Sequence, residues 1–400
     1  MRGRLAAGLV VLVVAGLLAW NYLRPYPAAA ASLRLPLQLT VPGTPPDLPW
    51  PSVGAAAVGV SGLGALATSG NEQRLPAASV TKVMTALVLL GDKPLAAGDS
   101  GPMISITEVD VTAYENDRAQ QQSVVKVQVG EKISEYSALE GMLIPSGNNM
   151  AETLARWDAG SVAAFVDQMN ARAKALGLSQ TVFADPAGAN PGSVSTPSDL
   201  MKLGMAAMKL PAFAQIVSLP SAVIPVAGAV YNVDAVLGKD GIIGIKTGSG
   251  FKLGANFLFA AAVSVSSHPV TIYGCVMGQP TLAAAFEVAR ALVRAMVPSL
   301  TVKQILARNQ AVGSYNTAWG DHTDLLSTVD VMVVEWPDMV MRERLDAPAL
   351  AVDRPVNPGV DAGKLHIVLG DYSLDVPLVT ASGLFPPSKA WRVTRLPGQS

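Results

Sequence analysis

The chain has 400 residues, of which half are apolar and only 15% are charged, and its formal net charge is −1. That length predicts two or three domains and allows a large hydrophobic core. A near-neutral balance without a block of lysine and arginine gives no electrostatic basis for binding nucleic acid. The single cysteine, Cys275, cannot form an internal disulfide, and its apolar neighbours predict a buried packing residue.

The N-terminal segment, residues 1–24, combines a basic start with an apolar run. Arg2 and Arg4 precede sixteen residues, Leu5–Trp20, that carry no polar side chain. This pattern predicts either a cleaved signal peptide or a retained membrane anchor, and both place the body of the protein outside the cytoplasm. The small residues that suit a cleavage site, Ala28–Ala31, lie well past the apolar run, which favours the anchor.

Three further regions follow in chain order. Residues 25–51 contain eight prolines and are predicted to form an extended linker. Residues 52–299 mix helical and strand periodicity. Within them we predict a strand pair at 53–68, helices at 79–90, 150–177 and 281–296, and strands at 242–246, 256–264 and 270–276. Residues 300–400 show short alternating runs between Asp, Pro and Gly turns, which predicts an all-β domain.

The first chemical motif is Ser79-Val80-Thr81-Lys82. It lies in a predicted helix, where positions three apart share a face, so Ser79 and Lys82 can touch. The same pattern at Ser123–Lys126 alternates as a strand does, which sends the two side chains to opposite faces. A third copy, Ser249–Lys252, has no helical pattern. Taken alone, Ser79 is better explained as the N-cap of a helix than as a nucleophile.

Two further motifs follow in order. Ser146-Gly147-Asn148 lies in a turn that leads into a helix; such turns favour Ser and Asn, but a hydroxyl and an amide can also move a proton and hold a substrate. Lys246-Thr247-Gly248 ends an apolar run and can present a cation, a hydroxyl and bare backbone at the end of a strand. Together the three motifs predict an acyl-transfer site in which a lysine activates a serine.

Longer runs around the motifs carry a family resemblance. They are Ala78–Thr85, Gly141–Asn148, Phe183–Gly188 and Ser195–Leu200. On these residues the chain, from about residue 53 to residue 298, resembles the low-molecular-mass penicillin-binding proteins of the D-alanyl-D-alanine carboxypeptidase family. The resemblance implies an α/β (α+β) fold of the serine β-lactamase/transpeptidase type, with helices around a central antiparallel sheet, followed by a small all-β domain.

The resemblance also implies a role for each motif. Ser79 would attack the penultimate D-alanine of a peptidoglycan stem pentapeptide, and Lys82 would take its proton, with a pKa lowered by burial and by the charge of Lys246. Ser146 would relay a proton to the leaving amine, and Asn148 would position Lys82 and the peptide. The substrate-binding groups would be Lys246, Thr247, Gly248 and Ser249. β-Lactam antibiotics would acylate the same serine, and no cofactor or metal is expected.

Other functions stay open at this point. A D,D-endopeptidase or transpeptidase would share the fold. A class A β-lactamase uses a glutamate between the second and third motifs, and residues 153–246 contain none, which predicts slow drug hydrolysis. A non-catalytic cell-wall-binding scaffold is disfavoured because all three motifs are intact. A Ser-His-Asp hydrolase is disfavoured because the chain has three histidines and no Gly-x-Ser-x-Gly elbow.

Overall fold

The computed structural model describes residues 2–70, 72–96, 98–250 and 253–395. Lys252 of the third Ser-x-x-Lys copy and the two ends of the chain lie outside the described residues. Contacts between residues divide the chain into two units. The central unit is Thr44–Thr301, and the terminal unit combines Met1–Gly43 with Val302–Ser400.

A five-stranded antiparallel sheet organises the central unit, in the order β11-β12-β13-β3-β4. Its strands are β11 (Ile242–Gly250), β12 (Gly254–Val265), β13 (His268–Gln279), β3 (Ala55–Val60) and β4 (Gly64–Thr68). Residues of β12 and β13 are buried in long apolar runs because helices cover both faces of the sheet. Strand β11 is an edge strand, so one side of its backbone remains free for another partner.

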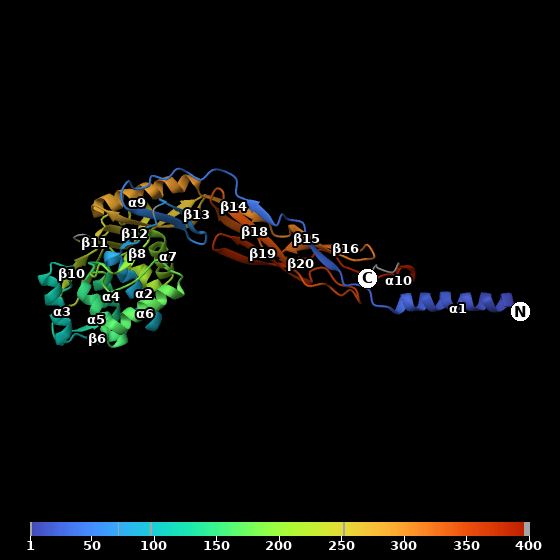
Figure 1. Ribbon diagram of the computed structural model, residues 1–400, viewed down its shortest axis with the longest axis horizontal. Coiled ribbons are helices and arrows are strands. Elements are labelled where there is room, and N and C mark those ends of the chain that lie inside the picture. Colours follow the sequence, from blue (N-terminus) through green and yellow to red (C-terminus); the bar gives the residue numbers. More distant parts are fainter. Residues whose placement is uncertain (1, 71, 97, 251–252, 396–400) are drawn as a thin grey trace. The chain divides into compact units, whose positions relative to one another are not determined.

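Helices pack on both sides of this sheet. Figure 1 shows α9 (Leu282–Met296) along one face and a group of helices on the other. That group includes α2 (Lys82–Asp92), α4 (Glu135–Leu143), α5 (Asn148–Ala159), α6 (Val162–Ala175) and α7 (Pro197–Ala207). The remaining helices of the unit are α3 (Glu108–Ala119), α8 (Pro211–Val217) and the 3-10 turns η1 (Ala78–Thr81), η2 (Lys239–Gly241) and η3 (Val297–Ser299).

Shorter strand pairs complete the central unit. They are β5 (Leu75–Pro76) with β8 (Val194–Ser195), β6 (Met103–Ser105) with β7 (Lys132–Ser134), and β9 (Ser221–Ile224) with β10 (Gly228–Tyr231). Side-chain caps fix several helix starts: Thr281 accepts from Ala284 N, and Thr196, followed by Pro197 at the first helical position, accepts from Asp199 N.

The structure corrects three local predictions. The helix predicted from Ser79 begins as a 3-10 turn, and α2 continues through Gly91 to Asp92. The helix predicted over 150–177 is two helices, because Gly160 takes a left-handed conformation (φ +76°) and ends α5. Residues 123–129 belong to no sheet. Their backbone bonds instead to the Asn149 side chain, which accepts from Val125 N and donates to Val125 O.

The terminal unit is built on a seven-stranded sheet in the order β1-β15-β16-β20-β19-β18-β2. Its C-terminal strands are β15 (Ala311–Asn316), β16 (His322–Ser327), β18 (Val340–Asp346), β19 (Asp361–Leu369) and β20 (Tyr372–Thr380), with β14 (Thr301–Leu306) and β17 (Val331–Glu335) paired separately. The two outermost strands, β1 (Ala30–Leu33) and β2 (Gln38–Thr40), come from the proline-rich stretch predicted to be a linker. Proline is tolerated around such edge strands because one side of their backbone is unpaired.

Among its described residues, the terminal unit has two helices. One is α1 (Arg2–Leu23), and the other is α10 (Lys389–Thr394), a short helix that the sequence did not lead us to expect. Among the described residues no single helix is long and apolar enough to cross a membrane; Ala7–Leu23 is a shorter apolar helix, and only the bent pair α7 and α8 meets that test by length and composition.

Candidate active site

Ser79 lies on the 3-10 turn η1, at the entrance of the buried helix α2. The turn is held from outside by Asn256 of β12, which donates to the carbonyls of Pro76 (2.9 Å) and Ala77 (3.1 Å). Ala78, just before the serine, has a left-handed φ of +47°, a conformation rare for a residue with a side chain. The serine is therefore half-buried on a backbone that its surroundings hold in an unusual shape.

Lys82 is fully buried, and its amine makes three hydrogen bonds. It donates to Ser79 Oγ (2.9 Å), to Asn148 Oδ1 (2.6 Å) and to the carbonyl oxygen of Ala187 (2.8 Å). Burial lowers the pKa of Lys82 well below its ordinary value, and the positive charge of Lys246 lowers it further, against a weaker opposite effect of nearby carboxylates. A lysine in this position can be neutral and accept the proton of the serine.

Asn148 joins the second motif to the first. Its Oδ1 accepts from Lys82, so its Nδ2 faces the other way and donates to Gln122 Oε1 at 2.5 Å. Its backbone N–H donates to the carbonyl of Ser123 (2.8 Å). The loop of residues 120–123 is thus tied to Asn148 by one side-chain and one backbone hydrogen bond.

Ser146 occupies the turn just before α5. It is buried, with 4% of its surface exposed, and has a left-handed φ of +69°. Within the described chain no group hydrogen-bonds to its hydroxyl, which leaves that hydroxyl available to a substrate.

The segment Phe183–Gly188, one of the runs that carry the family resemblance, also borders the site. Thr85 of α2 donates to the carbonyl of Pro186 (2.7 Å), next to the Ala187 carbonyl that holds Lys82. A methyl group on Gly188 (φ +77°) would lie 1.8 Å from the carbonyl oxygen of Ala78. Only glycine lets the backbone at position 188 come this close to the backbone of the serine turn.

Strand β11 contains the third motif, Lys246-Thr247-Gly248. Lys246 and Thr247 are buried, and Thr247 pairs with Phe257 in the sheet. Burial lowers the pKa of Lys246 to about 7, while the charge of Asp234 acts in the opposite direction. A methyl group on Gly248 would lie 3.0 Å from the backbone nitrogen of Ser79, so the absence of a side chain brings β11 close to the serine turn.

These elements enclose a polar groove of about 500 Å³. Ser79 and Asn148 line it together with residues of two loops and of the end of β11. The lining residues are Ser79, Gln120, Gln121, Gln122, Ser123, Asn148, Gly188, Ala189, Ser249, Gly250 and Leu253. The edge strand β11 borders this groove with its residues Ser249 and Gly250.

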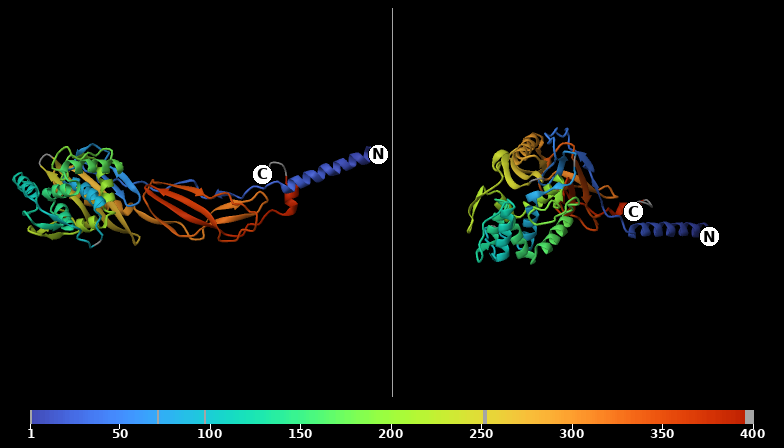
Figure 2. Two further views of the ribbon diagram at one scale, coloured as in Figure 1. Left: turned by 90° about the horizontal axis from the view of Figure 1, so that it is seen from below. Right: turned by 60° about the vertical axis from the view of Figure 1, so that its left-hand side comes forward.

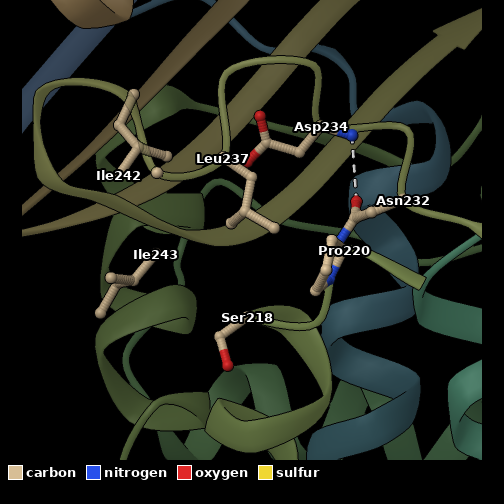
Figure 3. Close-up of a pocket in the computed structure, with 8 residues that line it drawn as sticks. Ser218, Pro220, Asn232, Asp234, Leu237, Ile242 and Ile243 are labelled. Carbon is tan, nitrogen blue, oxygen red and sulfur yellow. Dashed lines mark hydrogen bonds between the residues drawn. The ribbon is translucent and has the colours of Figure 1, made fainter. Parts of the chain in front are cut away.

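A separate cavity of about 450 Å³ lies at the start of β11 and contains Asp234 (Figure 3). Asp234 Oδ1 accepts from Val236 N (3.0 Å), whereas no described group bonds to the buried Oδ2. Burial raises the pKa of Asp234 to about 6, against the opposing effects of the Val236 hydrogen bond and of the charge of Lys246. Asp234 is thus a buried carboxylate that acts electrostatically on the lysine of the third motif.

The structure brings part of the predicted site together. Ser79, Lys82 and Asn148 are hydrogen-bonded to one another through Lys82, and Ser249 lines the same groove as Ser79. Among the described residues, Ser146, Lys246 and Thr247 do not line the groove and make no hydrogen bond to Ser79, Lys82 or Asn148. The sequence did not lead us to Gln122, Asp234 or Asn256, because a glutamine in a loop, a lone aspartate and a strand asparagine carry no motif. Ala187 lies within a quoted run and Asn149 directly follows another, but nothing in the sequence assigned a contact to either.

Comparison with known proteins agrees with this geometry. The family model of D-alanyl-D-alanine carboxypeptidases matches residues 62–281, more than half of the chain. The chain belongs to this family. As in other D-alanyl-D-alanine carboxypeptidases and penicillin-binding proteins, its fold is a mixed α/β fold with helices around an antiparallel sheet.

Individual members of the D-alanyl-D-alanine carboxypeptidase family are moderately similar. A D-alanyl-D-alanine endopeptidase of Pseudomonas aeruginosa is 34% identical over 146 residues, 36% of this chain and 44% of that protein. D-alanyl-D-alanine carboxypeptidase DacB2 of Mycobacterium tuberculosis is 34% identical over 48% of this chain and 65% of that protein. The chain thus spans less than two thirds of both relatives. Penicillin binding protein 5 of Haemophilus influenzae has the same fold, with a TM-score of 0.63, 21% identity, and coverage of 86% of this chain and 100% of that one.

Proposed function

We propose that the protein is a serine-type D-Ala-D-Ala carboxypeptidase that removes the terminal D-alanine from peptidoglycan stem pentapeptides. The observation that carries the proposal is the 2.9 Å hydrogen bond between Ser79 Oγ and the amine of Lys82. A buried lysine with a strongly lowered pKa, within hydrogen-bond reach of a serine, is a base and nucleophile pair.

In the proposed acylation, Ser79 Oγ attacks the carbonyl carbon of the penultimate D-alanine as Lys82 takes its proton. The backbone N–H groups of Ser79 and Ser249 stabilise the oxyanion, and such a donor contributes about 3 kcal/mol to the transition state. The proton passes through the Ser146 hydroxyl to the leaving amine, the peptide bond breaks, and D-alanine departs. Water then hydrolyses the ester and returns the enzyme to its starting state.

Substrate recognition in this proposal uses the side chains around the serine. Lys246, as the ammonium form, and Thr247 bind the terminal carboxylate of the peptide. Asn148 donates its Nδ2 to a substrate carbonyl once Gln122 has moved away. Gly248 leaves the strand backbone open, so the peptide can extend along β11 towards Ser249.

β-Lactam antibiotics would acylate Ser79 in the same way, because a β-lactam carries an acyl carbon beside a carboxylate as the peptide does. No step of the mechanism calls for a metal or a cofactor. For the place of action we propose the extracytoplasmic side of the cell membrane, with the N-terminal segment either as an anchor or as a leader that is removed.

A D,D-endopeptidase is the second candidate, favoured by the name of the similar Pseudomonas protein. The two activities differ in the leaving group, which is free D-alanine for a carboxypeptidase and a cross-linked stem peptide for an endopeptidase. Release of D-alanine from a pentapeptide, measured beside cleavage of a cross-linked dimer, separates them. A β-lactamase would instead release hydrolysed drug continuously.

Labelling with a fluorescent penicillin tests the proposed nucleophile. The wild-type protein is expected to take up one label per chain, and Ser79→Ala is expected to take up none because the acyl bond cannot form. Ser179→Ala, an exposed serine of the same unit, should label as the wild type does. A wild type that takes up no label, or label retained by Ser79→Ala, would contradict the proposal; the former outcome favours a cell-wall-binding scaffold.

A further inference from the structure

Helix α1 leaves its apolar side chains outside any protein core. Consecutive residues from Leu9 to Val14 are all exposed, including Leu9 (65%) and Leu12 (71%). Six consecutive positions cover every face of a helix, so no single face is turned to a partner within this chain. A helix that is apolar on all sides needs an apolar solvent around it.

The C-terminal end of α1 is locked to α10 by reciprocal caps. Arg395 donates through Nη2 to the carbonyl of Asn21 (2.9 Å) and through Nη1 to that of Pro25 (3.0 Å), and also to that of Arg24. In return Asn21 Nδ2 donates to the carbonyls of Val393 (2.6 Å) and Arg395 (2.9 Å). Both helices thus satisfy their last carbonyls with each other, which their own hydrogen-bond ladders cannot do. Figures 1 and 2 show α10 in red beside this end of α1.

Aromatic and basic side chains gather at this junction. We define the collar as Tyr22, Tyr26, Trp319, Trp391, Arg392 and Arg395. Trp319 packs edge-on against Tyr26 (5.4 Å between ring centroids) and Trp391 (5.6 Å), and the Arg392 guanidinium lies 4.3 Å from the Tyr22 ring centroid. Amphipathic rings with arginine are the side chains that suit the boundary between water and hydrocarbon.

The collar is also a concentration of positive charge. Burial and the neighbouring charges of Arg24 and Arg392 lower the pKa of Arg395. In the described part of the chain no carboxylate forms an ion pair with Arg392 or Arg395. Arg395 is buried and its guanidinium is occupied by the carbonyls of Asn21 and Pro25, and the carboxylate of Asp353 lies beside Tyr26. The partly buried Arg392 is therefore the group that can bind a phosphate oxygen.

The residues that suit signal cleavage lie in folded structure. Ala29 is fully buried and forms a backbone bridge with Leu350, with hydrogen bonds of 2.8 and 3.0 Å. Ala30 and Ala31 are the first residues of β1, paired with β15. Cleavage there would remove Tyr22, Tyr26 and the carbonyls that Arg395 caps, and would leave the rest of the collar without its partners.

We propose that α1 is retained in the mature protein and embeds its apolar part, Ala7–Leu23, in a phospholipid bilayer without having to cross it, with the collar at the level of the lipid headgroups. The proposal rests on the extracytoplasmic location given under the proposed function. It identifies the partner of α1 as the hydrocarbon layer and the partner of Arg392 as a lipid phosphate. The terminal unit then begins at the membrane surface, because β1 follows the collar by only a few residues.

Intact-mass measurement of the protein extracted from membranes tests retention. A mass that includes residues 5–23 supports the proposal, whereas a chain that starts at residue 29, 30, 31 or 32 overturns it. Penicillin labelling of the same sample reports separately on the proposed function. A labelled but cleaved protein refutes only the anchor, and an unlabelled, uncleaved protein refutes only the function.

Depth-dependent quenching of tryptophan fluorescence tests the collar. The full chain is placed in vesicles of phosphatidylethanolamine and phosphatidylglycerol that carry bromine either near the headgroup or near the end of the acyl chain. The fluorescence of Trp391 is obtained by subtracting the spectrum of Trp391→Phe from that of the wild type. The same subtraction with Trp336→Phe gives the fluorescence of Trp336, a buried tryptophan of the same unit that serves as the control. We expect at least twofold quenching of Trp391 by the shallow bromine only, and none of Trp336. Equal fluorescence of Trp391 with all lipids would overturn the headgroup placement.

Amide hydrogen exchange in the same vesicles tests the caps. Arg395→Ala is expected to increase exchange in residues 20–26 at least tenfold, and Arg395→Lys should recover part of the protection. Arg342→Ala, an exposed arginine on β18, is the matched control and should leave these amides unchanged. Unchanged exchange in Arg395→Ala would show that α10 does not hold α1.

Discussion

Asn148 has two functional atoms, and in the free protein both are occupied. Lys82 donates to its Oδ1, and Gln122 accepts from its Nδ2. In the proposed mechanism, the side-chain carbonyl of Gln122 therefore occupies the position that a substrate carbonyl would take. A substrate has to displace it, at the cost of about one neutral hydrogen bond, roughly 1 kcal/mol.

From this competition we predict that Gln122→Ala accelerates acylation by penicillin about fivefold, the factor that corresponds to about 1 kcal/mol. Stopped-flow measurement of the labelling rate checks this. Gln121→Ala, next to it in the same loop but exposed, is the control and should change the rate little. Slower acylation in Gln122→Ala would show that Gln122 assists the substrate instead of excluding it.

Lys246 has to be protonated to bind a carboxylate, and its pKa of about 7 places the loss of that proton near neutral pH. Burial lowers the pKa of Lys246, and the charge of Asp234 acts against this effect. The negative charge of Asp234 favours the ammonium form of Lys246. Removing that charge must lower the pKa of Lys246.

We therefore predict that Asp234→Asn moves the alkaline rise in KM for a pentapeptide to lower pH, by up to about one unit. The pH dependence of KM and of kcat, measured separately, checks this, because a carboxylate-binding group affects KM first. Asp240→Asn, an acidic residue of the same loop region that pairs with Arg290, is the control. An unchanged KM profile in Asp234→Asn would show that Asp234 does not influence Lys246.

At the scale of elements, the site depends on how closely three segments approach the serine turn. The Asn256 side chain of β12 hydrogen-bonds to the backbone of the turn. Gly248 lets β11 approach the turn, and Gly188 lets the segment 183–188 approach Ala78. Each contact involves backbone, which adapts less easily than the end of a flexible side chain. Small changes at these positions should thus displace Ser79.

We predict that Gly188→Ala lowers the free energy of unfolding by about 3 kcal/mol or more and abolishes penicillin labelling, because the new methyl group meets the Ala78 carbonyl. Gly177→Ala is a matched control: its φ of +69° is similar, but nothing lies within 4 Å of the added methyl. Gly177→Ala should lower the free energy of unfolding by only about 1 kcal/mol, the cost of a left-handed backbone for alanine, and should still be labelled by penicillin. Equal losses in urea unfolding for the two variants would contradict this account.

At the scale of the whole molecule, the two units have separate structural bases. The apolar cluster that includes Val83, Phe165 and Leu258 lies within the central unit, as do all residues assigned to the site. The terminal unit has its own sheet, and its two edge strands come from the N-terminal region. A unit with its own core is expected to fold on its own.

We predict that residues 44–301 alone fold cooperatively and are labelled by penicillin at a rate within about twofold of the full chain, a difference below about 0.5 kcal/mol in the barrier. The measurement is the labelling rate beside a thermal unfolding curve. The same fragment with Ser79→Ala gives the background. Loss of labelling in a fragment that still unfolds cooperatively would show that the terminal unit contributes to turnover.

Local patterns in the sequence were sufficient for much of this protein. Ser79 and Lys82 share a helix face, so their proximity could be predicted from their spacing, and the strands β11, β12 and β13 were predicted from apolar runs. The order of three motifs with the runs around them indicated the family. These predictions succeeded because each depends on residues that are neighbours in the chain.

What only the tertiary structure decided depends on residues distant in sequence. Burial sets the pKa of Lys82 and of Lys246, and the cavity around Asp234 makes that carboxylate a neighbour of Lys246. The proline-rich stretch, which reads as a linker by composition, supplies both edge strands of a sheet whose other strands follow residue 310. Periodicity and propensity describe one segment at a time. Pairing at a sheet edge and desolvation of a charge depend on which distant segments pack against that strand or that side chain in the folded protein.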